Sequence, residues 1–261
     1  MKRPLRAVIF DYGNTLVGVD PALHSKRTDY ADVVAVPATE RLARHLEERG
    51  LISRNEGVRF MDLFLATRER NRVRAEESGD EIPATVSLGD AFREMGRPEP
   101  DPATAVEALR RFFSVEEEAL QELPGAGATL RHVEERGLAI ALLSNATDGP
   151  YIVRVVERMG WGRYFRPLVV SSDIGVRKPR PEAFQAVLSG WPYAPDEIAM
   201  VGDSLHHDVG GAHALGLRTF HLAWIPNPMD PQYLGRIRPD VSAKSHADLA
   251  SQLLEAAAPD D

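Results

Sequence analysis

Carboxylates, hydroxyls and one lysine follow four separate apolar runs of this sequence. A carboxylate can attack an electrophilic centre or bind a hard cation, and a hydroxyl or a turn of free backbone N–H groups can bind phosphate oxygens. A lysine beside them supplies the positive charge that a carboxylate needs when it approaches an anion. In chain order these residues are Asp11, Ser144 with Asn145, Lys178, and the pair Asp203 and Asp208.

The apolar runs that precede these residues are predicted to be strands of a buried parallel sheet. They are short, rich in aliphatic residues and without regular polar alternation, which is typical of strands covered on both faces. The predicted strands are residues 5–10, 138–143, 168–170, 198–201 and 218–222. The helical patterns between them are residues 126–135, 151–159, 182–188 and 208–215. Strands that alternate with helices predict an α/β fold with a doubly wound parallel sheet.

The predicted topology brings the four polar segments to one edge of the sheet. In open parallel sheets, ligands bind outside the carboxyl ends of the strands, near the point where the strand order reverses. Each residue alone has a structural explanation: Ser144 as a turn hydroxyl, Lys178 as a solvated charge and Asp208 as a helix cap. Because all four segments fall at the same edge, we expect them to form one site.

A long helical insert separates the first strand from the rest of the sheet. Its predicted helices are residues 38–48, 53–77, 88–95 and 103–113. In the longest one, Val58, Met61 and Leu65 recur at the spacing of one helix face. The sequence therefore predicts two domains, an α/β core domain of residues 1–17 and 122–261 and a smaller all-helical domain of residues 18–121.

The composition excludes several classes of protein. The chain has 261 residues, 43% of them hydrophobic and 27% charged, so a folded protein with a sizeable core is expected. Its formal net charge of -8 disfavours nucleic acid and anionic membranes as partners, and the absence of cysteine excludes disulfides and thiol nucleophiles. No apolar run has the length of a signal peptide or a membrane span, so we expect a cytoplasmic location. No pattern predicts an oligomeric state.

Taken together, the four segments resemble the motifs of the haloacid dehalogenase superfamily, in the same order along the chain. They are Asp11-Tyr-Gly-Asn-Thr15, then Ser144, then Lys178 in the context Lys-Pro-x-Pro-x-x-Phe, and then Gly202-Asp203 with Asp208. The helical insert is similar in position to the cap domain that the family carries after its first strand. The resemblance therefore implies a Rossmann-like core domain with a smaller helical cap.

The resemblance also implies a role for each site residue. Asp11 would be the nucleophile that forms an aspartyl-phosphate, with Ser144 and Lys178 as the other catalytic residues. The residues that would bind the phosphoryl oxygens are Asn14, Thr15, Ser144, Asn145 and Lys178. The residues that would bind Mg²⁺ are Asp11, the backbone carbonyl of Gly13, Asp203 and Asp208.

Gly13 departs from the family pattern. Phosphatases of this family usually have a second Asp two residues after the nucleophile, which protonates the leaving group and activates the incoming water. Such an acid–base group typically contributes about 10²- to 10⁴-fold to the rate, whereas the metal requires only a backbone oxygen from this position. Asp20, His24 and His206 are candidates to replace it.

The function that these observations favour is hydrolysis of a small phosphorylated metabolite by a Mg²⁺-dependent phosphomonoesterase. The first alternative is a dehalogenase of the same superfamily, although three acidic residues favour a metal site and halide release needs none. The second is a catalytically impaired protein that binds phosphate or regulates another process, which Gly13 suggests. The proline-rich segment 225–239 is predicted to be a surface loop that borders the site.

Overall fold

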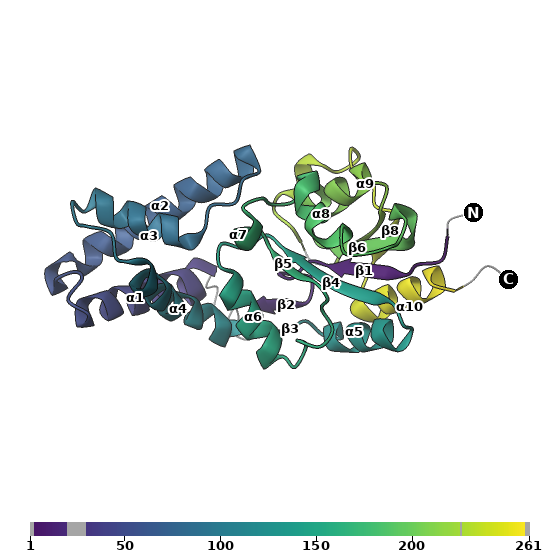
Figure 1. The fold of residues 1–261 in the computed structure, drawn as a ribbon, viewed down its shortest axis with the longest axis horizontal. Helices are drawn as coiled ribbons and strands as arrows, with labels where there is room; N and C mark the ends of the chain where they lie inside the picture. The colour runs from purple at the N-terminus through teal and green to yellow at the C-terminus, as the bar shows by residue number, and fades with distance from the viewer. Residues whose placement is uncertain (1–2, 20–29, 225, 259–261) are drawn as a thin grey trace. The chain divides into compact units, whose positions relative to one another are not determined.

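The chain groups into two compact units. The computed structural model describes residues 3–19, 30–224 and 226–258 (Figure 1). The sheet unit comprises Met1–Gly18, Glu122–Gly149 and Val156–Asp261, and the helical unit comprises Val19–Gln121 and Pro150–Val155. Asp20 and His24, two of the predicted acid–base candidates, lie outside the described residues.

The sheet unit is built on a parallel six-stranded sheet with the strand order β5-β4-β1-β6-β7-β8. The strands are β1 (Ala7–Phe10), β4 (Ala139–Ser144), β5 (Leu168–Val170), β6 (Ile198–Gly202), β7 (Arg218–Leu222) and β8 (Val241–Ala243). The chain first runs outward from β1 through β4 to β5 and then crosses to β6 on the other side of β1. The strand order therefore reverses at β1, and the predicted α/β fold with a parallel sheet is confirmed.

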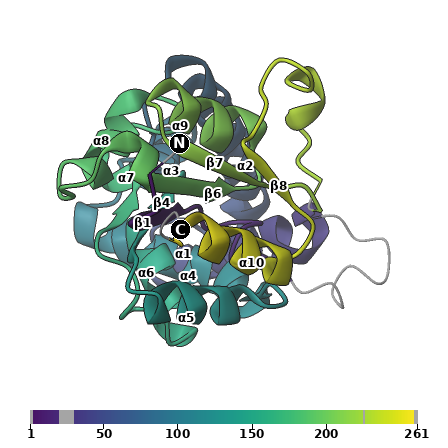
Figure 2. The same ribbon diagram turned by 90° about the vertical axis from the view of Figure 1, so that its right-hand side faces the viewer.

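Helices cover both faces of this sheet. In Figures 1 and 2, α8 (Pro181–Leu188) and α9 (Gly211–Ala214) lie on one face, and α5 (Ala126–Glu135) and α10 (His246–Ala256) lie on the other. The core under α8 includes Ala7 and Ile9 of β1, which pack with Phe184. All four residues of β1 are buried, as the apolar run predicted. The unit also contains the short helix α7 (Ser171–Ile174) and the two ends of α6 (Gly149–Arg158).

Three elements near the carboxyl end of the chain differ from the prediction. The helix expected at residues 208–215 begins earlier, with a π-helical turn at Leu205–Gly210 that leads into α9. It begins earlier because the hydroxyl of Ser204 accepts the N–H of His207 and thereby caps the turn. Strand β8 and helix α10 were not predicted. The first has only three residues, and the second is marked by its N-cap Ser245, whose hydroxyl accepts the N–H of Asp248.

The described part of the helical unit has four main helices and an aromatic core. They are α1 (Val36–Glu48), α2 (Gly57–Ser78), α3 (Ala84–Glu94) and α4 (Pro102–Ala119). The ring centroids of Phe60 and Phe92 are 5.8 Å apart, and those of Phe64 and Phe112 are 5.3 Å apart. Helix α4 runs six residues past its predicted end at Phe113, since its last turns bury Val115 and Ala119.

Residues 150–155 of α6 group with the helical unit, whereas the predicted boundaries placed them in the core domain. The ring of Tyr151 stacks on Phe113 with a centroid distance of 5.1 Å, and the Arg154 guanidinium donates to Glu117. A two-stranded sheet of β2 (Val17–Val19) and β3 (Leu120–Glu122) lies where the chain passes from one unit to the other. The role of the helical unit as a cap stays a prediction.

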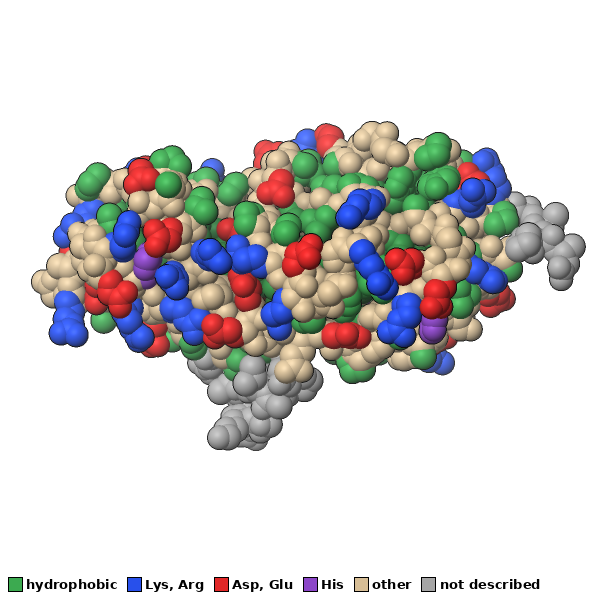
Figure 3. Space-filling model, turned by 60° about the horizontal axis from the view of Figure 1, so that its bottom comes forward, with side chains coloured by type: hydrophobic (Ala, Val, Ile, Leu, Met, Phe, Trp, Pro, Cys, Tyr) green, Lys and Arg blue, Asp and Glu red, His purple; other side chains and the backbone are tan. Residues whose placement is uncertain are grey.

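The surface of the described residues carries both signs of charge. On the face drawn in Figure 3, Lys and Arg side chains are interspersed with Asp and Glu. Among the helices of the described chain, none combines the length and the apolar character that crossing a bilayer demands.

Candidate active site

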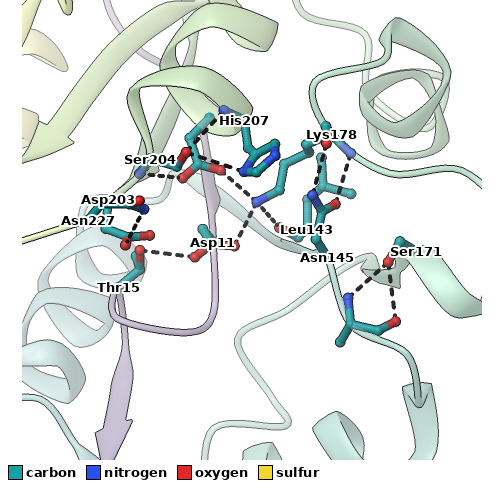
Figure 4. A network of polar contacts seen from close by, with 12 residues as sticks. Asp11, Thr15, Leu143, Asn145, Ser171, Lys178, Asp203, Ser204, His207 and Asn227 are labelled. Carbon is teal, nitrogen blue, oxygen red and sulfur yellow. Dashed lines mark hydrogen bonds and ion pairs between the residues drawn. The ribbon is translucent and has the colours of Figure 1, made fainter. Parts of the chain in front are cut away.

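Three buried aspartates meet at the carboxyl ends of β1 and β6. One carboxylate oxygen from each of Asp11, Asp203 and Asp208 lies within 4.8 Å of the others. The register explains the meeting: Phe10 pairs with Val201, and the N–H of Asp11 donates to the carbonyl of Val201 over 2.9 Å. Gly202 has room for no side chain, because a Cβ there would collide with the carboxylate of Asp208. The adjacent strand ends thus bring Asp11 and Asp203 together (Figure 4), and the helical turn that follows β6 adds Asp208.

Lys178 joins this cluster from the segment between α7 and α8. Its Nζ donates to Asp11 Oδ1 and Asp208 Oδ1, each over 2.6 Å, and to the carbonyl of Leu143 over 2.8 Å. An ammonium has three N–H bonds, so all of them are occupied. The side chain is only 1% exposed. Burial alone would lower the pKa of Lys178, but the two carboxylates outweigh it and raise the pKa, so the group stays charged.

The cluster has more negative than positive charge available to it. Burial raises the pKa of Asp11, and the charge of Asp208 adds to that effect while Lys178 opposes it. Burial and the charges of Asp11 and Asp208 raise the pKa of Asp203 to about 8. Three carboxylates therefore face one ammonium in a buried place. A divalent cation fits this donor set, because Mg²⁺ prefers oxygen ligands and supplies the missing positive charge.

The turn after β1 places the remaining residues of the first motif. The hydroxyl of Thr15 donates to Asp11 Oδ2 over 3.2 Å. Asn14 has a left-handed φ of 53°, and both Asn14 and Gly13 are exposed. The φ of Gly13 is outside the left-handed region, and a Cβ built there has no atom within 4 Å. The backbone would therefore accept a side chain at position 13.

The two predicted phosphate-binding residues at the end of β4 lie in different environments. Ser144 is the last residue of β4 and is buried. The side-chain amide of Asn145 donates to the carbonyl of Lys178 over 2.9 Å and accepts the N–H of Lys178 over 2.8 Å (Figure 4). Because both ends of this amide bind the main chain of Lys178, Asn145 fixes the position of the lysine.

Four residues that sequence reasoning did not select also hold the acids in place. The N–H of Ser204 donates to Asp208 Oδ2 over 3.0 Å. Asn227 donates to Asp203 Oδ2 over 3.0 Å, and His221 and Asp230 contact the turn that contains Asp203. The proline-rich segment was predicted only as a loop bordering the site, yet it contributes Asn227 and Asp230. No motif marks them, since they act across at least 24 positions of sequence.

The third acid–base candidate, His206, lies against the proline-rich segment. Its ring stacks on Tyr233 with a centroid distance of 4.5 Å and an interplanar angle of 1°. The neighbouring His207 places Nδ1 at 3.3 Å from the hydroxyl of Ser204 (Figure 4). A role of His206 as the substitute acid stays a prediction.

Comparison with known proteins gives relatives that are phosphatases. A phosphoserine phosphatase of Thermus thermophilus is 34% identical over 131 residues, which are 50% of this chain and 51% of that protein. A phosphoglycolate phosphatase of Escherichia coli is 29% identical over 256 residues, or 95% of this chain and 92% of that protein. The match thus spans about half the length of the first relative and nearly all of the second.

A solved structure and a family model agree on the fold. The crystal structure of a 2-haloacid dehalogenase from Pseudomonas syringae aligns with a TM-score of 0.64 at 20% identity, covering 97% of this chain and 100% of that one. At this identity the likeness concerns the fold. The model for haloacid dehalogenase-like hydrolases matches residues 5–216, which include Asp11, Ser144, Lys178, Asp203 and Asp208. The chain therefore belongs to the haloacid dehalogenase-like hydrolases, as its four motifs had implied.

Proposed function

We propose that the protein is a Mg²⁺-dependent phosphomonoesterase that acts on a small phosphorylated metabolite through an aspartyl-phosphate. The observation that carries this proposal is the buried acidic cluster. In it, Lys178 Nζ lies 2.6 Å from Asp11 Oδ1 and 2.6 Å from Asp208 Oδ1, with the carboxylate of Asp203 beside them. A nucleophilic carboxylate next to a fixed ammonium and further acids suits attack on a phosphoryl group. Relatives named as phosphatases support the same reaction class.

Asp11 is the nucleophile in this proposal. One of its carboxylate oxygens forms a bond to phosphorus while the bond from phosphorus to the ester oxygen breaks, and the leaving alkoxide takes a proton from solvent water to become the alcohol. Water then attacks phosphorus, the bond from phosphorus to Asp11 breaks, and inorganic phosphate leaves. Lys178 holds one oxygen of Asp11 and Thr15 holds the other, so the carboxylate is oriented before substrate arrives.

Asp11, Asp203, Asp208 and the carbonyl of Gly13 are the groups that would hold Mg²⁺. When bound, the ion supplies positive charge that offsets the carboxylates and the phosphoryl oxygens. Ser144 and the backbone N–H groups of the following turn would bind those oxygens, together with Asn14 and Thr15. Lys178 contributes its charge from a fixed position, because its three N–H bonds are already occupied.

Gly13 limits the proton transfers that this site can perform. A positioned acid would protonate the leaving alcohol, and the same group as a base would deprotonate the attacking water. With glycine at this position, the second step loses its base. We therefore propose that hydrolysis of the aspartyl-phosphate is the slow step. The helical domain of residues 18–121, acting as a cap over the core domain of residues 1–17 and 122–261, would select the substrate.

A phosphate-release screen tests this function. Sugar phosphates, nucleotides and phospho-acids are incubated with the protein in Mg²⁺ or in chelator, and Asp11→Asn prepared in the same way controls for contaminating phosphatases. We expect release from at least one ester in Mg²⁺ only. A parallel assay of chloride release from 2-chloropropionate tests the dehalogenase alternative. Halide release that persists in chelator, without phosphate release, would overturn the proposal.

A further inference from the structure

A four-residue turn at the start of the proline-rich segment presents two polar side chains to the acidic cluster. In this turn, Asn227-Pro228-Met229-Asp230, the N–H of Asp230 donates to the carbonyl of Asn227 over 3.1 Å. The N–H of Met229 donates to Asn227 Oδ1 over 3.0 Å. The orientation of the Asn227 amide follows from this bond, since only its oxygen can accept from an N–H. Its NH₂ group must point the other way.

The Asn227 NH₂ group points to Asp203. Nδ2 donates to Asp203 Oδ2 over 3.0 Å (Figure 4). An aspartate carboxylate rotates broadly about its last bond, so a donor on one oxygen restricts which way the other oxygen faces. Within the part of the chain that the structure describes, Asp203 Oδ1 accepts no hydrogen bond, so this oxygen is left for a ligand in the site.

Asp230 holds the same turn against the carboxyl end of β6. Its Oδ1 accepts the N–H of Leu205 over 2.7 Å, and its Oδ2 lies 3.1 Å from His221 Nε2. The same Nε2 lies 3.0 Å from the carbonyl oxygen of Asp203. Both neighbours of this nitrogen are acceptors, so Nε2 carries a proton and donates. His221, on β7, therefore contacts both the main chain of Asp203 and the side chain of Asp230 through the same nitrogen.

We propose that Asn227 is a positioning residue that orients the Asp203 carboxylate for a divalent cation, and that Asp230 and His221 hold Asn227 in place. This inference rests on the proposed function in that Asp203 serves there as a Mg²⁺ ligand. It assigns to the segment 226–239, which the four motifs do not include, a part in the site. Loss of a hydrogen bond to a metal-binding carboxylate typically weakens metal affinity by about 10- to 100-fold.

Asn227→Ser isolates this role. The serine hydroxyl can still accept the N–H of Met229 and keep the turn, but it is too short to reach Asp203. Gln232→Ser is the matched control, because it removes an amide from an exposed position of the same segment. Asp230→Asn is the second variant, since it keeps an acceptor for Leu205 and loses the acceptor for His221.

Calorimetric titration of the metal-free protein with Mg²⁺ gives the direct measurement, and melting temperatures report the fold. We expect Asn227→Ser to raise the Mg²⁺ dissociation constant by about 10-fold or more, Asp230→Asn to raise it as well, and Gln232→Ser to stay within about twofold of the parent. Saturating Mg²⁺ should restore the turnover of Asn227→Ser, so the effect appears in the metal dependence of activity and not in its maximum.

Two results separate this inference from the proposed function. Parent-like Mg²⁺ affinity in both Asn227→Ser and Asp230→Asn overturns the role of Asn227 even if the parent is an active phosphatase. A parent that binds Mg²⁺ but hydrolyses no phosphate ester overturns the phosphatase and leaves the comparison of dissociation constants to decide on Asn227. A parent that binds no Mg²⁺ overturns the inference.

Discussion

The turns that follow β1 and β6 are held in place in the same way but differ in their charged and polar side chains. Each begins with an aspartate, and each is held by a buried histidine that donates to a main-chain oxygen. His246 Nε2 lies 2.9 Å from the carbonyl of Thr15, and His221 Nε2 lies 3.0 Å from the carbonyl of Asp203. Each histidine is distant in sequence from the turn that it contacts, so a tertiary contact holds each turn in place.

The difference lies in the number of charged and polar side chains. The turn after β6 adds a second carboxylate, Asp208, and receives the amide of Asn227, whereas the turn after β1 has an exposed Gly13 two residues beyond its aspartate. In the proposed function, the turn after β6 would supply most of the cation ligands, and the turn after β1 would supply the nucleophile. If the proposed function is right, the site would bind a metal and form a phosphoenzyme without the usual side chain for proton transfer at position 13.

Removing the proposed nucleophile should have the largest effect. Asp11→Asn should reduce phosphatase turnover to below about 1% of the parent, because an amide cannot form the aspartyl-phosphate. The melting temperature should not fall, since burial and Asp208 already oppose the charge of Asp11. Steady-state phosphate release and circular dichroism provide the measurements. A variant that retains more than a few per cent of parental turnover would show that the covalent mechanism is wrong.

The next largest effect should come from the turn after β6. Asp203→Ala removes one of three clustered carboxylates, so turnover should fall by roughly 10²-fold or more and millimolar Mg²⁺ should not restore it. Chelator should abolish the phosphatase activity of the parent, and added Mg²⁺ should restore it. Activity that is undiminished in chelator would instead favour the dehalogenase alternative.

Substitution of Gly13 tests whether the turn after β1 lacks a group for proton transfer. An aryl phosphate needs little protonation of its leaving group, so rapid-quench measurements should show a burst of about one equivalent of alcohol before a slow steady state. Gly13→Asp should shorten the intermediate's life and raise turnover by about 10-fold or more. Gly13→Ala is the matched control, because its Cβ fits equally well and brings no carboxyl group.

The contrary result at this position is also specific. If the parent shows no burst and His206→Ala or Asp20→Asn removes activity on alkyl phosphates, another group supplies the proton. Slow hydrolysis of the aspartyl-phosphate would then have to be abandoned.

The smallest effect should be a pH dependence of stability from the histidine behind the β1 turn. Burial lowers the pKa of His246 from the ordinary 6.5. The unfolded chain therefore binds a proton before the folded one as the pH falls below 6.5, so this histidine costs stability on the acid side. His246→Gln can still donate to Thr15 and does not titrate. Its melting temperature between pH of about 7 and 5 should fall less steeply than that of the parent. If the melting temperatures of His246→Gln and the parent fall equally over this pH range, His246 is not the source of the pH dependence.

Local patterns were sufficient for the strands that carry the site, because buried parallel strands are short apolar runs. Strand β7 at Arg218–Leu222 was predicted to the residue. The cluster of Asp11, Asp203 and Asp208 follows from the strand ends and the topology. The contacts of Asn227 and Asp230 could not be predicted, since a proline-rich loop has no periodicity that fixes where its side chains point. Asn145 was predicted to bind phosphate, but its pairing with the main chain of Lys178 depends on tertiary structure.

The burial of Lys178 has a practical consequence for coupling chemistry. Amine-directed reagents react with accessible, neutral amines, and Lys178 is 1% exposed and held as an ammonium by two carboxylates. Lys244, the other lysine among the described residues, is exposed. Of these two lysines, a label or a solid support directed at amines should therefore modify Lys244 and leave Lys178 unmodified. The same chemistry that is usually avoided for lysine-dependent enzymes can tether this one.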